Sequence, residues 1–149
     1  MQSRWLLLAL APPLAGCGNS MDRLPNDLRA AMEGPESMEV FKIESVMKPA
    51  HPGEKIRDYP VLKRIDVQPG DRPLVTAWLR DDVLSESGDS AKCFDPHDAL
   101  RVKKGGDTFI VLVCTSCGGV AIFRNEKRIG SFSTKVGAKS PEGTLRFLR

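Results

Sequence analysis

Residues 100–114, LRVKKGGDTFIVLVC, carry the strongest structural signal in this chain. Leu100 and Val102 alternate with basic residues, which is the period of a strand with one buried face. The pair Gly105-Gly106 that follows is typical of a two-residue β-hairpin turn. Residues 109–114 are then apolar without interruption, as expected of a strand that is buried on both faces. The segment therefore predicts a β-hairpin with a fully buried second strand.

The same turn predicts which residues face each other across the hairpin. If Gly105 and Gly106 form the turn, residue 104 faces residue 107, and each further step moves one residue outward on both strands. Continuing this count places His97 opposite Cys114. Directly opposed residues have Cβ atoms about 4.5–5.5 Å apart, so these two side chains are expected to be neighbours.

Further strands are expected on both sides of this hairpin, at residues 38–46, 60–67, 119–124 and 129–132. Apolar residues recur at helical spacing between residues 72 and 84, which predicts one main helix. A short helix is expected at residues 26–32. The predicted fold class is α+β, with an antiparallel sheet, a β-meander in the C-terminal half, packed against one main helix.

The N-terminal residues have the organisation of an export signal. Arg4 precedes the apolar run 5–11, which is too short to span a bilayer. The run leads to Leu14-Ala15-Gly16-Cys17, which resembles the lipobox of bacterial lipoproteins. In that family the signal is cut before the cysteine, and the cysteine thiol carries a diacylglyceryl group. The resemblance implies fatty-acyl chains on Cys17, with palmitate among them, and a permanent membrane anchor.

The resemblance also implies a domain organisation and a location. Residues 1–16 would be the signal peptide, residues 17–37 the lipidated cysteine and a tether, and residues 38–149 a single α+β globular domain. Gly18, in place of an aspartate, favours attachment to the outer membrane facing the periplasm over the inner membrane. The expected partners are the membrane and an envelope protein. The net charge of +3 is small and the basic residues are scattered, so no nucleic-acid partner is expected.

Three further cysteines and one histidine form a candidate site: Cys93, His97, Cys114 and Cys117. The hairpin register brings His97 and Cys114 to one end of the sheet, and the other two cysteines are close in sequence. A Cys3His set is a composition that holds structural zinc. Exported cysteines usually pair, so a disulfide from Cys93 to Cys114 or Cys117 is the equally weighted alternative. Thiol–disulfide exchange is a third interpretation.

Two local patterns carry resemblances. Cys114-Thr115-Ser116-Cys117-Gly118 is similar to the metal-binding knuckle of zinc ribbons and rubredoxins. The segments Cys93-Phe94-Asp95-Pro96-His97 and Cys114 to Cys117 resemble the Cys-Phe-x-Pro-x-His and Cys-x-x-Cys patterns of a group of small, uncharacterised bacterial proteins. That resemblance spans residues 38–133 and implies that these residues lie together, but it brings no activity.

The chain contains no serine-nucleophile motif, phosphate-binding loop or dinucleotide fingerprint. We therefore assign no catalytic residues, and a non-enzymatic role is favoured over a small hydrolytic enzyme, which ranks last among the alternatives. The predicted function is a lipid-anchored, non-enzymatic envelope protein that acts by binding or assembly, with a structural Cys/His cluster. The alternative is a redox or metal-handling periplasmic protein that uses Cys114 and Cys117, with zinc as the candidate cofactor.

Overall fold

The computed structural model describes residues 20–85, 93–134 and 137. One antiparallel sheet of seven strands dominates them, in the order β2-β3-β1-β4-β5-β6-β7. The strands are β1 (Ser37–Ile43), β2 (Lys55–Ile56), β3 (Tyr59–Asp66), β4 (Asp98–Lys104), β5 (Asp107–Cys114), β6 (Gly119–Arg124) and β7 (Lys127–Ser133). The helical elements are η1 (Ser20–Arg23), α1 (Asn26–Glu33), η2 (Pro69–Asp71), α2 (Arg72–Ala77) and η3 (Trp78–Val83).

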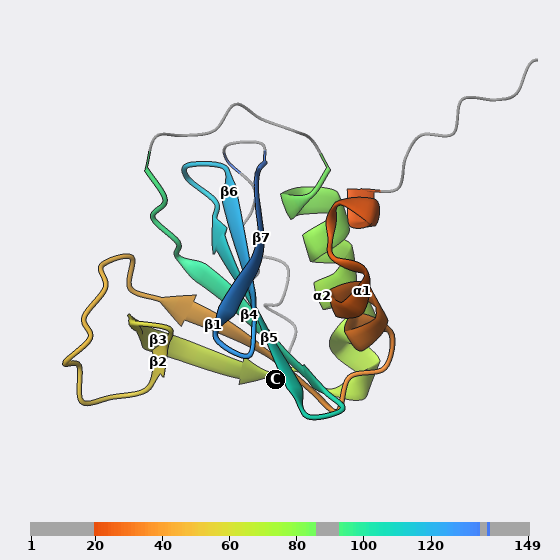
Figure 1. The fold of residues 1–149 in the computed structure, drawn as a ribbon, viewed down its shortest axis with the longest axis horizontal. Helices are drawn as coiled ribbons and strands as arrows, with labels where there is room; N and C mark the ends of the chain where they lie inside the picture. The colour runs from red at the N-terminus through yellow and green to blue at the C-terminus, as the bar shows by residue number, and fades with distance from the viewer. Residues whose placement is uncertain (1–19, 86–92, 135–136, 138–149) are drawn as a thin grey trace, which may run out of the picture.

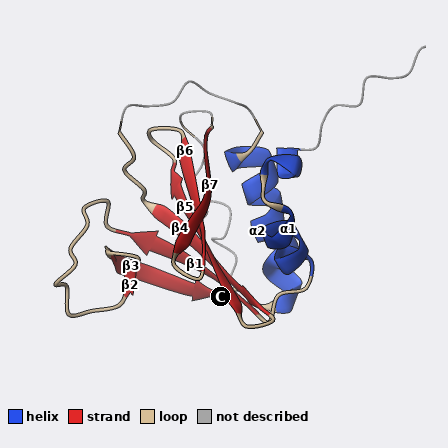
Figure 2. Cartoon of the chain, viewed as in Figure 1, coloured by secondary structure: helices blue, strands red, loops and turns tan. Residues whose placement is uncertain are grey.

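The expected α+β class with one main helix is wrong. The described fold is mainly β, and its helices are short (Figure 2). The early strands β1, β2 and β3 continue the C-terminal meander into a single sheet, because β1 pairs with β4 on one side and with β3 on the other. The sheet therefore has one strand more than the hydrophobic pattern predicts, β2, and the expected main helix is divided into α2 and η3.

The hairpin predicted at residues 100–114 is confirmed. β4 and β5 pair from Lys104↔Asp107 to Asp98↔Val113. Gly105 and Gly106 have φ values of 60° and 82°, which glycine adopts at little cost and other residues rarely adopt. β5 lies between β4 and β6, and its last six residues, 109–114, are all buried. β5 therefore contributes side chains to the apolar clusters on both faces of the sheet.

The helix expected at residues 72–84 forms in two parts. α2 is α-helical, and η3 is wound more loosely as a π-helix, in which the N–H of Leu84 donates to the carbonyl of Leu79 at 2.9 Å. Trp78 and Leu79 are buried at the start of η3, at 1 % and 0 % exposure. The wider winding of η3 accompanies a continuous buried face along these residues.

The helices all cover one face of the sheet, as Figure 1 shows. α1 contributes Leu28, Ala31 and Met32 to the core on this face, and Leu24 joins them from the turn before it. The sequence assigns residues 20–37 to the tether. Much of this segment instead packs against the sheet, so the folded domain begins well before residue 38.

The opposite face carries a second, smaller apolar cluster that includes Phe41, Ile43, Ile110 and Leu112. The sheet curls over this face. The turn between β2 and β3 therefore meets the turn between β6 and β7, where Arg57 forms an ion pair with Glu126. Four strands separate β2 from β6 in the sheet order, so only a strong curl can bring these two turns together.

Candidate functional site

Cys114 and Cys117 lie at the end of β5 and in the turn that leads to β6. Their sulfur atoms form a disulfide, with the two Cα atoms 5.4 Å apart. Cys114 is fully buried and Cys117 is 9 % exposed. The structure thus pairs the two cysteines of the Cys-x-x-Cys motif with each other, and Cys93 remains a free, exposed thiol.

The backbone of the turn is arranged around the Cys114 sulfur. The N–H of Cys117 donates to Sγ of Cys114 at 3.0 Å, and the N–H of Gly118 donates to the Cys114 carbonyl at 3.0 Å. Gly118 has a φ of 65°, which suits glycine and lets the chain reverse into β6. An N–H aimed at a sulfur stabilises the thiolate once the disulfide is reduced, because hydrogen bonds to the charged form favour that form.

His97 lies beside the same end of the sheet. The regular β4–β5 ladder ends at Asp98↔Val113, and the N–H of His97 donates to the carbonyl of Val113 at 3.1 Å. Its carbonyl accepts from the N–H of Ile43 on β1 at 2.9 Å. The register argument therefore places His97 correctly at the level where β5 ends. Its Nδ1 is buried and has no hydrogen-bond partner among the described residues.

Cys93 lies near the disulfide without joining it. It lines a shallow hollow of about 260 Å³ together with Cys117 and residues of β6 and β7. The ring of Phe94 covers Gly119 in the wall of this hollow, and a Cβ built on that glycine would lie 3.0 Å from the ring. Glycine at this position lets the aromatic ring approach the backbone of β6.

These positions do not fit a Cys3His zinc site. The sulfurs of Cys114 and Cys117 are bonded to each other, so neither is a thiolate ligand. Among residues 20–85 and 93–134, no group of three or more His, Cys, Asp or Glu side chains is arranged to hold a metal ion. We therefore derive no chemistry through zinc.

Two acidic residues near His97 have other roles. Asp98 is buried at 1 % exposure and forms an ion pair with Lys42 at 3.3 Å. Asp95 acts on Tyr59: burial raises the pKa of this phenol, and the negative charges of Asp95 and Asp58 raise it further. The carboxylate of Asp95 thus lies near Tyr59, which belongs to the apolar cluster on the face away from the helices.

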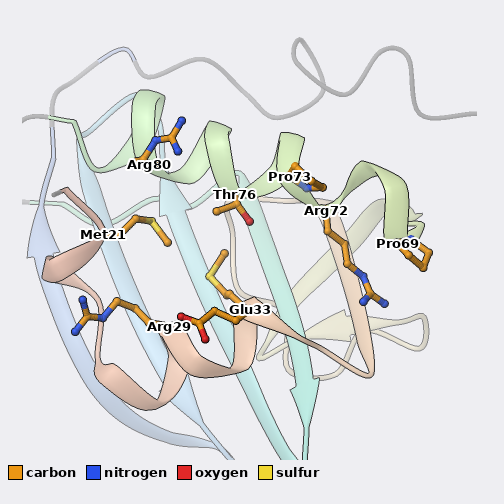
Figure 3. Close-up of a pocket in the computed structure, with 9 residues that line it drawn as sticks. Met21, Arg29, Glu33, Pro69, Arg72, Pro73, Thr76 and Arg80 are labelled. Atoms are coloured by element: carbon orange, nitrogen blue, oxygen red, sulfur yellow. The ribbon is translucent and has the colours of Figure 1, made fainter.

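The helices form a groove of about 660 Å³ between α1 and α2 (Figure 3). Three arginines line it, but two of them already have acidic partners: Arg29 pairs with Asp22, and Arg80 pairs with Asp81 at 2.6 Å. The positive charge of this groove is therefore largely compensated.

The sequence reasoning missed a third hollow, which lies on the face opposite the helices. It collects basic side chains from β2, β4 and the turn after β2, including Lys103. In the sequence Lys103-Lys104 is an ordinary charged pair beside a turn. No local signal marks this hollow, because its walls come from segments far apart in the chain.

The lipidation candidate Cys17 lies outside the described residues. In the described part of the chain, no helix combines the length and the apolar character needed to cross a membrane. Comparisons with protein-family models, curated proteins and solved structures found no match for this chain.

Proposed function

We propose that this chain is a lipid-anchored protein of the bacterial cell envelope whose domain acts by binding rather than by catalysis. The observation that carries the proposal is Leu14-Ala15-Gly16-Cys17, directly after a short basic and apolar leader. Two or more acyl chains on one cysteine give stable attachment, whereas a single chain gives only marginal attachment.

Two features of the described residues agree with this role. A disulfide between Cys114 and Cys117 is typical of an oxidising compartment such as the periplasm. The chain enters the fold at Ser20, whose hydroxyl donates to the carbonyl of Arg80 at 2.9 Å. Three residues span at most about 11 Å, so a lipid on Cys17 would hold the domain next to the bilayer surface.

The test is an intact-mass measurement on protein expressed in a Gram-negative host. We expect the mass of residues 17–149 plus the diacylglyceryl and acyl groups, in the membrane fraction. The variant Cys17→Ser should keep its leader or lose the lipid, whereas Cys93→Ser should be processed normally. A chain that still begins with Met1, or an unmodified sulfur at position 17, would contradict the proposal.

The second candidate function is thiol–disulfide redox chemistry at Cys114 and Cys117. It is favoured by the N–H of Cys117 aimed at Sγ of Cys114 and by the free thiol of Cys93 in the neighbouring hollow. The full burial of Cys114 works against it, because exchange needs access to a sulfur.

Thiol titration distinguishes the two functions. If the disulfide is structural, the native protein should expose the thiol of Cys93 alone and should resist mild reductants. A disulfide that equilibrates with glutathione would favour redox chemistry, and tightly held zinc by elemental analysis would contradict the disulfide itself.

A further inference from the structure

We propose that the hollow on the sheet face opposite the helices binds a ligand that carries phosphate or carboxylate groups. This inference names the ligand chemistry for the binding role proposed above and rests on that role. It does not depend on the lipid anchor, so a failure of lipidation at Cys17 leaves it standing.

The hollow has a volume of about 450 Å³, within the range of small-molecule sites. Ile56 and Ile110, which are 1 % and 6 % exposed, contribute apolar surface to it. Four basic residues and two acidic residues supply its charge. They are Lys55, Arg57, Arg101, Lys103, Asp58 and Glu126. Glu126 balances Arg57, and Glu39 and Glu54 outside the lining balance Arg101. The positive charge that is left to attract an anion into this concave site therefore comes from Lys55 and Lys103.

The two arginines are held in place by the protein. Nη1 of Arg57 donates hydrogen bonds to Glu126, and the guanidinium stacks on Phe123, with its carbon 4.4 Å from the ring centre. Arg101 bonds Glu39 through Nε and Nη2, at 2.5 and 2.9 Å. A guanidinium has five N–H groups, so each arginine keeps donors for a ligand. Because the side chains are already ordered, binding costs little further rotamer entropy.

The two lysines supply charge that no described carboxylate neutralises. Lys55 donates to the backbone carbonyl of Pro49, which carries no formal charge. Lys103 is exposed, and among the described residues its ammonium group forms no ion pair. Both residues line the hollow, Lys55 from β2 and Lys103 from β4. They distinguish it from the groove between α1 and α2, where Asp22 and Asp81 compensate arginines.

The curl of the sheet forms this hollow. Arg57 has a φ of 57°, a left-handed conformation that costs a non-glycine residue roughly 1–2 kcal/mol. The conformation turns the β2–β3 hairpin so that Arg57 reaches Glu126, 69 positions further along the chain. Planar guanidinium groups suit the paired oxygens of phosphate and carboxylate groups. A ligand with two such groups would engage the arginines and the lysines together.

The experiment titrates the full chain, in a non-ionic detergent at low ionic strength, with pyrophosphate and separately with citrate. Binding is followed by calorimetry and by the backbone amide NMR shifts of Thr108 and Ile110. We expect at least one probe to bind, to shift these amides, and to bind more weakly as salt is added. The probe that binds more tightly shows whether the site prefers phosphate or carboxylate.

Lys55→Gln and Lys103→Gln should each weaken binding about fivefold, since an exposed charge at contact distance contributes about 1 kcal/mol. Lys63→Gln is the matched control, because Lys63 lies on β3 opposite Lys42 and does not line the hollow. If neither probe binds, the inference is overturned. Unchanged affinity in both lysine variants, or amide shifts confined to α1 and α2, overturns it as well.

Discussion

Glu39 shows how one residue links three strands of this sheet. It lies on β1, opposite Arg101 of β4 and Asp66 of β3 in the sheet register, and it is only 5 % exposed. Its carboxylate accepts two hydrogen bonds from Arg101 and forms an ion pair with Arg64 at 2.6 Å. A buried carboxylate is tolerated because positive partners satisfy its oxygens.

Glu39→Ala should lower the free energy of unfolding by about 2–3 kcal/mol, because the 18 %-exposed Arg101 loses both hydrogen bonds to Glu39 and keeps only Glu54, 3.7 Å away. Urea denaturation measures the change. Asp81→Ala is the control, since Asp81 pairs with Arg80 at an exposed site and should change stability little. Equal effects of the two substitutions would show that the Glu39 network adds nothing.

Asp107 should make the stability of the protein depend on pH in the acid range. Hydrogen bonds from Arg124, and then from Asn125, lower the pKa of Asp107 below its usual value. A carboxyl whose pKa is lower when folded stabilises the protein above its unfolded pKa of about 3.9. That stabilisation is lost as the pH falls through the folded value.

Asp107→Asn should therefore destabilise the protein at neutral pH and converge with the unsubstituted protein at low pH. Urea midpoints measured from about pH 6 down to about pH 2 test this expectation. A constant difference between the two proteins across this range would contradict it.

At the scale of elements, α1 is the piece whose role changes most between sequence and structure. Its polar residues and its proline-flanked position are typical of a linker, yet Leu28 is fully buried against the sheet. An eight-residue helix is not stable by itself in water, so packing of its apolar side must hold it.

Leu28→Ala should lower the free energy of unfolding by about 3 kcal/mol, because alanine in place of a buried leucine leaves a cavity. Leu62→Ala is the control, because Leu62 on β3 is 63 % exposed and should change stability little. A small effect at Leu28 would mean that α1 is dispensable for the core and belongs functionally with the tether.

At the scale of the whole molecule, the curl of the sheet joins parts of the chain that local pairing does not connect. The contact between Arg57 and Glu126 bridges two turns from opposite ends of the strand order. The same curl closes the second apolar cluster and leaves the basic hollow at its rim. Binding, in the role proposed here, is thus a property of the curled sheet rather than of a motif.

A double-mutant cycle on Arg57→Ala and Glu126→Ala tests this long-range contact. Glu126 is 77 % exposed, so the coupling free energy should be at most about 1 kcal/mol, and it should shrink as salt is added. Additive effects of the two substitutions, with no coupling at low salt, would show that the two turns meet without stabilising each other.

Local rules predicted both the β4–β5 hairpin and its register, because a Gly-Gly turn sets the pairing and each further step follows from strand geometry. The same reasoning located His97 at the end of β5. The sequence did not predict four features: the pairing of Cys114 with Cys117, the two-residue strand β2, the mainly β class and the basic hollow. Two of these features are local, since Cys114 and Cys117 are three positions apart and β2 pairs with the adjacent β3. They were missed because Cys93 offered an equally good partner and because two residues are too few to show a strand period. The mainly β class and the basic hollow depend on twist accumulated over seven strands and on contacts between distant segments such as Arg57 and Glu126. No window of sequence contains both partners of such contacts, so folding of the whole chain decides them.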